Sequence, residues 1–159
     1  MKVFKSLNRI TLNYTKNSVL IIGNLDGVHK GHQSIINSAK KIANEQKTKI
    51  GVLLFDPHPR KYFNKNIKSF LLTELNERLE ILKSYGIDYA IIIKFNKKIS
   101  SMTPNDFCKK ILRWTGSSAR DWRISSLFLL WSARLFTAEV VPGSSHDPES
   151  RAFMWGSSA

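Results

Sequence analysis

The first two-thirds of the chain contain three short apolar runs that are rich in Val, Ile and Leu. A strand with one solvated face alternates apolar and polar residues, whereas a strand covered on both faces is apolar throughout. The runs therefore predict three buried strands, over Ser18–Gly23, Ile50–Phe55 and Tyr89–Phe95.

A helical pattern follows the first run. From about His32, apolar residues recur at i, i+1, i+4, i+7 and i+8, a spacing that places them on one face of a helix. These residues are Ile35, Ile36, Ala39, Ile42 and Ala43. The polar segment from Asp56 to about Ser69 contains prolines and is predicted as a loop.

Two further helices are marked by their ends. Thr73 is placed to cap the first of them, and Gly86 is placed to end it. Its apolar face comprises Leu75, Leu79 and Leu82. The last helix opens at Thr103, with Pro104 in its first turn and Asp106 three residues after the cap.

The resulting order is strand, helix, strand, helix, strand, helix. Buried strands that alternate with helices indicate a parallel sheet covered on both faces, so the predicted fold class is α/β. Ligands of such sheets bind at the carboxyl ends of the strands.

Composition narrows the class of protein further. The 159 residues suffice for one domain, and the single cysteine, Cys108, excludes a disulfide within the chain and is interpreted as a helix thiol. No apolar run approaches the ~18–20 residues that span a bilayer, and the N-terminus shows no secretory signal, so we expect a cytoplasmic protein without a membrane partner.

The net charge of +13 comes from scattered lysines, so no nucleic-acid partner is expected. The oligomeric state is left open.

Residue usage changes abruptly near residue 113. All 17 lysines and all 11 asparagines precede this point, whereas all four tryptophans follow it. A natural linker would be polar and free of Trp. We therefore divide the chain into a domain over residues 1–112 and an unrelated, poorly ordered tail over residues 113–159, out of frame or foreign in origin. The alternative is a genuine but unusual C-terminal extension.

A glycine-rich motif directly follows the first predicted strand: Gly23-Asn24-Leu25-Asp26-Gly27-Val28-His29-Lys30-Gly31-His32. The glycines permit a tight turn and close approach to a ligand, and the next helix offers free N–H groups to an anion. His29 and His32 can face one phosphate, where imidazoles would stabilise developing charge. Two alternatives stay open. The pair could bind a metal, although no further ligands cluster nearby, or either histidine could be a cap or packing residue.

A second motif, Phe55-Asp56-Pro57-His58-Pro59-Arg60, follows the second predicted strand. Its prolines fix the loop, and Arg60 could form a fork onto a phosphate. Tyr62 and Phe63 behind it could pack on a flat ring. The alternative interpretation is a Pro-stiffened turn with two buried aromatic residues.

Together the two motifs resemble the FAD synthetase module that is commonly fused to a riboflavin kinase, within the nucleotidylyltransferase superfamily. The first motif, followed by Gln33, is similar to the family's Gly-Asn-Phe-Asp-Gly-Val-His-x-Gly-His-Gln string, with Leu25 in place of the usual Phe. The second is similar to its Phe-[Glu/Asp]-Pro-His-Pro-[Arg] segment. Weaker matches continue to residue 112.

The resemblance implies a Rossmann-like parallel sheet of the nucleotidylyltransferase type and FMN adenylyltransferase activity. ATP, accompanied by Mg²⁺, and FMN would give FAD and pyrophosphate. It implies catalytic roles for His29 and His32, and no metal ligands. ATP phosphates are assigned to Gly23, Asn24, Asp26, Gly27 and Gly31, and the flavin or its phosphate to Pro57, His58, Pro59 and Arg60.

Two segments of the family do not appear after Leu112: a Gly-x-[Asp/Asn]-[Phe]-x-Phe-Gly loop and a Ser-Ser-[Thr]-x-[Ile]-Arg segment that contacts ATP phosphates. No riboflavin kinase segment appears either. We therefore expect a sheet that is incomplete at its C-terminal end and impaired activity in this chain. Another His-x-Gly-His adenylyl- or cytidylyltransferase, or a non-catalytic nucleotide-binding fragment, are the alternatives.

Overall fold

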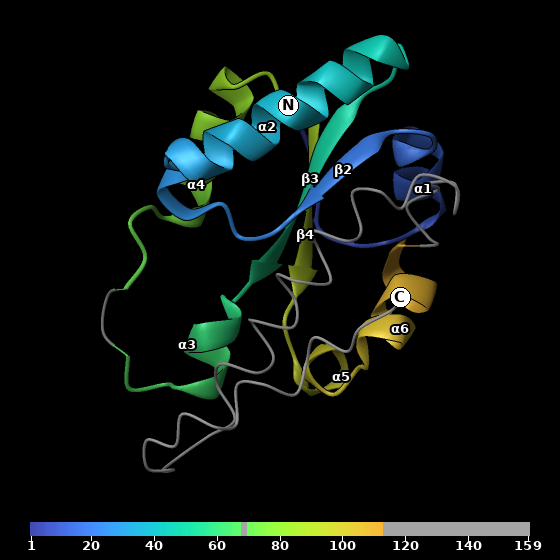
Figure 1. Ribbon diagram of the computed structural model, residues 1–159. Helices are drawn as coiled ribbons and strands as arrows, with labels where there is room; N and C mark the ends of the chain where they lie inside the picture. Colours follow the sequence, from blue (N-terminus) through green and yellow to red (C-terminus); the bar gives the residue numbers. More distant parts are fainter. Residues whose placement is uncertain (68–69, 113–159) are drawn as a thin grey trace, which may run out of the picture.

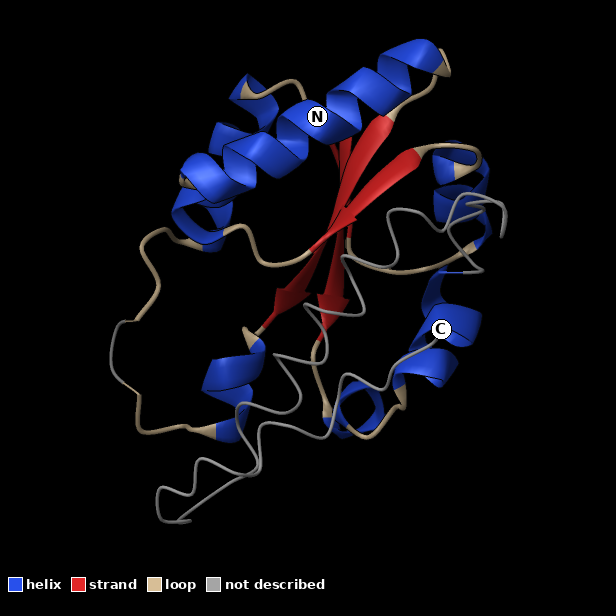
Figure 2. Cartoon of the chain, in the orientation of Figure 1, coloured by secondary structure: helices blue, strands red, loops and turns tan. Residues whose placement is uncertain are grey.

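The computed structural model describes residues 1–67 and 70–112, so the predicted tail over residues 113–159 lies outside the described residues. The described part contains a four-stranded sheet in which every neighbouring pair is parallel (Figures 1 and 2). The strands, in the spatial order β1-β4-β3-β2, are β1 (Lys2–Phe4), β2 (Val19–Ile22), β3 (Ile50–Asp56) and β4 (Tyr89–Lys94). The predicted α/β class is confirmed.

Helices occupy the connections between the strands. They are α1 (Arg9–Thr15), α2 (Lys30–Glu45), α3 (Pro59–Phe63), α4 (Leu75–Ser84), α5 (Lys97–Ser100) and α6 (Pro104–Phe107), with a 3₁₀ turn over Asp26–Val28 and a π-helical turn over Cys108–Leu112. In Figure 1, α2 and α4 lie on one side of the sheet, and α1, α5 and α6 lie on the other.

Two apolar clusters hold these layers together. On the α2 and α4 side, Ile36 and Leu82 pack with Val52, and all three side chains are fully buried. On the other side, Leu53 and Tyr89 are equally buried. The strands are thus apolar on both faces, which is the reason their sequences form continuous apolar runs.

Two of the three predicted helix ends are confirmed. Gly86 follows α4 with a left-handed φ of +73°, and its N–H donates to the Lys83 carbonyl at 2.9 Å. At the start of α6, Thr103 Oγ1 accepts from the Asp106 N–H at 3.1 Å and donates to the Asp106 carboxylate at 3.0 Å. Thr103 therefore caps the helix as predicted, and the Asp106 carboxylate binds its hydroxyl.

The prediction that Thr73 caps α4 is wrong. Glu74 occupies the cap position, without a side-chain cap, and Thr73 Oγ1 instead donates to Asp26 at 2.8 Å. The predicted loop from Asp56 to Ser69 also contains a helix, α3, which begins at Pro59. Pro59 is buried and lies at the first turn, where a missing N–H costs nothing.

Two elements at the N-terminus were not predicted. The strand β1 has only three residues, two of them exposed, and it forms by pairing with β4. The helix α1 buries only Thr11 and Thr15, so it has no apolar stripe. In the described ranges, no helix is both long and apolar enough to cross a membrane.

Candidate active site

The two motifs lie side by side because the strands that precede them are neighbours. β2 and β3 are parallel, with Ile22 paired to Leu53, so both following loops leave the same edge of the sheet. Asn24 ties the loops together, since its Oδ1 accepts from the Phe55 N–H at 3.2 Å. The Asn24 side-chain amide is buried, and its Nδ2 has no hydrogen-bond partner in the described residues.

Two glycines of the first motif lie close to neighbouring side chains. Gly27 has a φ of +66°, a left-handed conformation that a side chain disfavours, and an added Cβ would lie 2.8 Å from Leu72 Cδ1. At Gly31 an added Cβ would lie 3.2 Å from the His29 ring. The glycines therefore leave room for the neighbouring chain and for the imidazole.

The histidine pair stands at the start of α2. His29 is the residue that precedes the helix, and its ring stacks on that of His32 with centroids 3.7 Å apart and planes 25° apart. His29 is exposed and His32 is half-buried, so the pair lies at the surface of the loop. The first amides of the 16-residue helix α2 open toward the same region, which suits an anion.

The surroundings of His32 favour its neutral form. Burial and the neighbouring His29 hold the pKa of His32 below its ordinary value, against the opposing effect of Asp26. His32 Nδ1 is buried and has no hydrogen-bond partner among the described residues. A buried polar atom without a partner is costly, so this nitrogen is available to a ligand or water.

Asp26 is held by the protein on both carboxylate oxygens. Oδ2 accepts from the Leu72 N–H at 2.8 Å, and Oδ1 accepts from the Thr73 N–H at 3.0 Å and from Arg78 at 3.2 Å. Burial raises the pKa of Asp26, but these hydrogen bonds and the Arg78 charge outweigh burial and leave the pKa lowered. The ATP-phosphate role predicted for Asp26 stays a prediction. Because both of its oxygens already accept from protein donors, its contacts favour a role in shaping the loop over direct contact with a phosphate.

The second motif is organised around His58. The preceding Asp56–Pro57 bond is cis, and His58 Nδ1 accepts from the Arg60 N–H at 3.0 Å at the start of α3. Burial, followed by the charge of Arg78, lowers the pKa of His58 to about 4. The motif therefore presents a neutral imidazole near pH 7.

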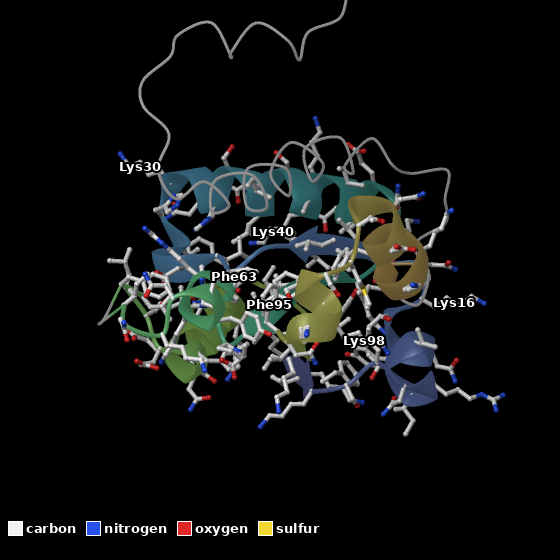
Figure 3. All side chains as sticks on the ribbon, turned by 90° about the horizontal axis from the view of Figure 1, so that it is seen from below. Lys16, Lys30, Lys40, Phe63, Phe95 and Lys98 are labelled. Carbon is white, nitrogen blue, oxygen red and sulfur yellow. The ribbon has the colours of Figure 1, made fainter. Side chains whose placement is uncertain are left out.

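Aromatic rings line the region behind this motif. Tyr62 and Phe63 of α3 contact Phe95, with ring centroids 5.2 and 5.9 Å away, and Figure 3 shows Phe63 and Phe95 side by side. Phe63 is 55% exposed, so part of this aromatic surface is open to a ligand. The Tyr62 and Phe63 pair was predicted as a packing surface for a flat ring, and that role remains a prediction.

Three residues of the region were not assigned to the site from the sequence. Phe70 lies edge-on to His58 at 4.9 Å between centroids, and Arg78 reaches Asp26 from α4. Phe95 follows β4 and completes the aromatic surface. Only the position of Phe95, at the carboxyl end of a predicted strand, was a usable signal, since ligands bind at that edge.

The described residues offer no protein-built metal site. None of their His, Cys, Asp and Glu side chains form a group of three or more that could hold a metal ion. Asp26, the acidic residue of the first motif, already has protein donors on both oxygens. That the protein supplies no metal ligands stays a prediction.

The fold and the site define a class: an α/β protein with a glycine turn and paired histidines at the carboxyl end of a parallel strand. Residues 11–119 match the family described as FAD synthetase. The chain belongs to the FAD synthetase family, as the two motifs predicted.

Curated relatives share the described domain. The bifunctional riboflavin kinase/FMN adenylyltransferase of Buchnera aphidicola subsp. Acyrthosiphon pisum is 34% identical over 112 residues, which make up 70% of this chain and 36% of the relative. The protein of the same name from Escherichia coli K12 is 29% identical over 112 residues, with the same coverage. That from Listeria monocytogenes is 36% identical over 98 residues, or 60% of this chain and 31% of the relative. The chain thus spans about a third of the length of these relatives.

A solved structure gives an independent view of the fold. The crystal structure titled macrolide-efflux protein from Streptococcus pneumoniae superposes with a TM-score of 0.60 at 22% sequence identity. The match covers 73% of this chain and 39% of that one. At this identity the likeness shows the fold alone.

Proposed function

We propose that the site transfers the adenylyl group of ATP to the phosphate of FMN, which makes the chain an FMN adenylyltransferase. The observation that carries the proposal is the stacked pair His29 and His32 at the first turn of α2, behind a glycine turn. The proposed substrates, ATP and FMN, are taken from the FAD synthetase family and from the names of its relatives.

The reaction requires no covalent enzyme intermediate. An oxygen of the FMN phosphate attacks the α-phosphorus of ATP, the bond to the bridging oxygen of the β-phosphate breaks, and pyrophosphate leaves. Charge grows on the α-phosphate oxygens and on the leaving group. The imidazoles of His29 and His32 and the first amides of α2 would donate hydrogen bonds to that charge.

The second motif and the aromatic surface suit the flavin. Phe63 and Phe95 offer flat apolar faces, and a flat ring stacked there would gain dispersion and burial. His58 and Arg60 both lie against the ring of Phe70. The charges of Asp26 and Arg78 also act on His58, so the second motif is electrostatically coupled to the first. This arrangement supports an assignment of the motif to FMN or its phosphate.

Mg²⁺ would enter as the partner of ATP, with the nucleotide phosphates as its ligands. The described side chains do not fit a resident ion, because Asp26 is committed to Leu72, Thr73 and Arg78. No step of the proposal runs through a protein-bound metal.

The direct test is to incubate the purified chain with ATP, Mg²⁺ and FMN and to follow FAD by chromatography and pyrophosphate by a coupled assay. ATP affinity is measured in parallel by calorimetry. His32→Ala should sharply reduce the rate of any FAD formation, whereas Lys41→Ala, an exposed change on the same helix α2, should leave it unchanged.

Alternative acceptors separate this proposal from its rivals. Nicotinamide mononucleotide and pantetheine phosphate replace FMN in parallel reactions. Adenylyl transfer to either of these, with none to FMN, would refute the assignment to FMN. ATP binding without transfer to any acceptor would favour a non-catalytic nucleotide-binding protein.

A further inference from the structure

A four-residue segment before α4 bridges the two histidine motifs. We call residues 70–73 the strap. The Leu72 and Thr73 amides donate to Asp26 of the first motif at 2.8 and 3.0 Å. At the other end of the strap, the ring of Phe70 lies against His58 of the second motif. The strap therefore contacts both candidate motifs at once.

The strap also closes over the glycine turn. The Gly27 N–H donates to Thr73 Oγ1 at 3.3 Å, and the space where a Gly27 Cβ would sit is taken by Leu72. Leu72 itself is 75% exposed. Its backbone, held by Asp26, fixes the position of the strap, because an exposed side chain contributes little burial.

Beneath the strap lies a buried cation. Arg78 of α4 is only 3% exposed, and its guanidinium donates to Thr73 Oγ1 at 3.2 Å, to the Thr73 carbonyl at 2.6 Å and to Asp26 at 3.2 Å. Removing a guanidinium from water is costly unless its donors are matched by acceptors. The planar fork of arginine suits this task, since several donors point in fixed directions.

We propose that Arg78 is a positioning residue of this site: its guanidinium joins Asp26 of the glycine turn to Thr73, and so holds the strap between the two histidine motifs. The functional part of this inference rests on the proposed adenylyl transfer. Arg78 is buried and donates to Asp26 and Thr73, so it acts through Asp26 and the strap.

The charge of Arg78 has a second effect on the same site. It disfavours protonation of both His58 and His32, whereas the Asp26 carboxylate favours it. Arg60 acts on His58 and His29 acts on His32 in the same direction as Arg78. An uncharged imidazole has one donor and one acceptor nitrogen, whereas the charged form has two donors, so Arg78 favours the form with a single N–H.

The competing interpretation is that Arg78 forms a structural salt bridge and does not position the strap. Two substitutions of Arg78 distinguish the two interpretations. Arg78→Lys keeps the charge but loses the fork, whereas Arg78→Met loses both at similar length. Lys83→Met on the same helix is the control, since Lys83 pairs with Glu80 at the exposed surface. Two NMR readouts use the full chain: amide hydrogen exchange of Leu72 and Thr73, and titration of the His32 and His58 imidazoles.

In Arg78→Met, the two strap amides should exchange ~10-fold faster or more, because local opening becomes easier. The pKa of His58 should rise from about 4 toward its ordinary value of 6.5. In Arg78→Lys, the amides should exchange faster, but the pKa of His58 should stay low. Lys83→Met should change neither quantity.

Unchanged amide exchange together with an unchanged His58 titration in Arg78→Met would overturn the proposal. If that variant does not fold, Arg78→Lys decides: wild-type exchange at Leu72 and Thr73 would refute the positioning role. These readouts need no turnover. A wild-type chain that neither binds ATP nor forms FAD would count against the proposed function. The exchange and titration results would still test whether Arg78 positions the strap.

Discussion

His29 and His32 stack on each other but stand in different surroundings. His29 is exposed, whereas His32 is half-buried and has a ring nitrogen without a partner in the described residues. The half-buried ring of His32 therefore has less freedom to reorient before a ligand arrives than the exposed ring of His29. A preorganised donor stabilises developing charge at lower cost than a mobile one.

Substitution of either histidine should therefore reduce turnover far more than flavin binding. In an intact relative of the family, the change that corresponds to His29→Ala or His32→Ala should lower kcat by ~10²–10³, as loss of one oxyanion donor does. Affinity for FMN should change little, since the imidazoles are assigned to ATP phosphates. Steady-state kinetics and FMN fluorescence titration check the two quantities. Normal kcat in both variants would reject the catalytic assignment.

His58 should make the stability of the fold depend on pH between about 4 and 6.5. In the unfolded chain His58 binds a proton near pH 6.5, whereas in the fold its pKa is about 4. Between these values the unfolded state holds more protons, so stability rises with pH through this window and is lost as pH falls. Thermal unfolding measured at pH 4.5, 5.5 and 7 should show the midpoint falling toward low pH.

The matched variant is His58→Asn, which retains an acceptor for the Arg60 N–H but does not titrate. Its midpoint should fall less between pH 7 and pH 4.5 than that of the wild type. His32, whose pKa is also lowered, leaves a residual dependence in the variant. Identical pH profiles for the two proteins would show that His58 is protonated as readily in the fold as in the unfolded chain.

At the residue scale, the motifs identified candidate side chains of the site but did not predict the residues that hold those side chains in place. Asp26 was assigned to ATP through the resemblance of its motif to the family, yet the guanidinium that holds it comes from Arg78, 52 residues later. No local pattern links two such positions. Arg78 also falls on a helix among Leu79 and Leu82, where a charged residue is ordinarily expected on the solvated face.

At the element scale, the strength of each pattern decided the outcome. The strands β2, β3 and β4 and the helices α2 and α4 were predicted because burial on one or two faces imposes a period on the sequence. The strand β1 and the helix α3 were missed because each is too short to show a period. β1 depends on pairing with β4, in which each partner residue lies 87 positions later in the sequence, as Tyr89 does from Lys2, so no local pattern predicts it.

Close packing between β3 and β4 leads to a prediction about stability. Gly51 of β3 lies against the ring of Tyr89 in β4, and an added Cβ would lie 2.1 Å from a ring atom. Gly51→Ala should therefore destabilise the fold by about 1–3 kcal/mol or more, as overpacking of a core does. Chemical denaturation gives the value. The double variant Gly51→Ala/Tyr89→Leu should lose less than the sum of the two single changes, because the smaller side chain makes room. Strict additivity would show that the two residues do not compete for the same space.

At the scale of the whole molecule, the family match and the described structure end at nearly the same place in the sequence. The family match ends at residue 119, close to the end of the described residues and of the resemblance read from the motifs. The strand β2, which precedes the first motif, is at one edge of the sheet in the described ranges. The first motif of the candidate site therefore follows an edge strand of the described sheet.

The last prediction concerns the 159-residue chain by itself. Catalysis of adenylyl transfer depends on fixing two substrates and on donors around the α-phosphate, and each missing donor costs orders of magnitude. This sequence contains the two motifs with His29 and His32, but not the phosphate-contacting segment that the resemblance leads us to expect after Leu112. We therefore expect the purified chain to form FAD from ATP, Mg²⁺ and FMN well below ~1 s⁻¹, under the ordinary range of enzymes.

Riboflavin in place of FMN should give no FMN, because no segment of this sequence resembles a riboflavin kinase. A full-length relative of the same family, assayed in parallel, is the positive control for both reactions. FAD formation at ~1 s⁻¹ or more by the chain itself would mean that residues after 112 complete the site. The division of the chain near residue 113 into a domain and an unrelated tail would then be wrong.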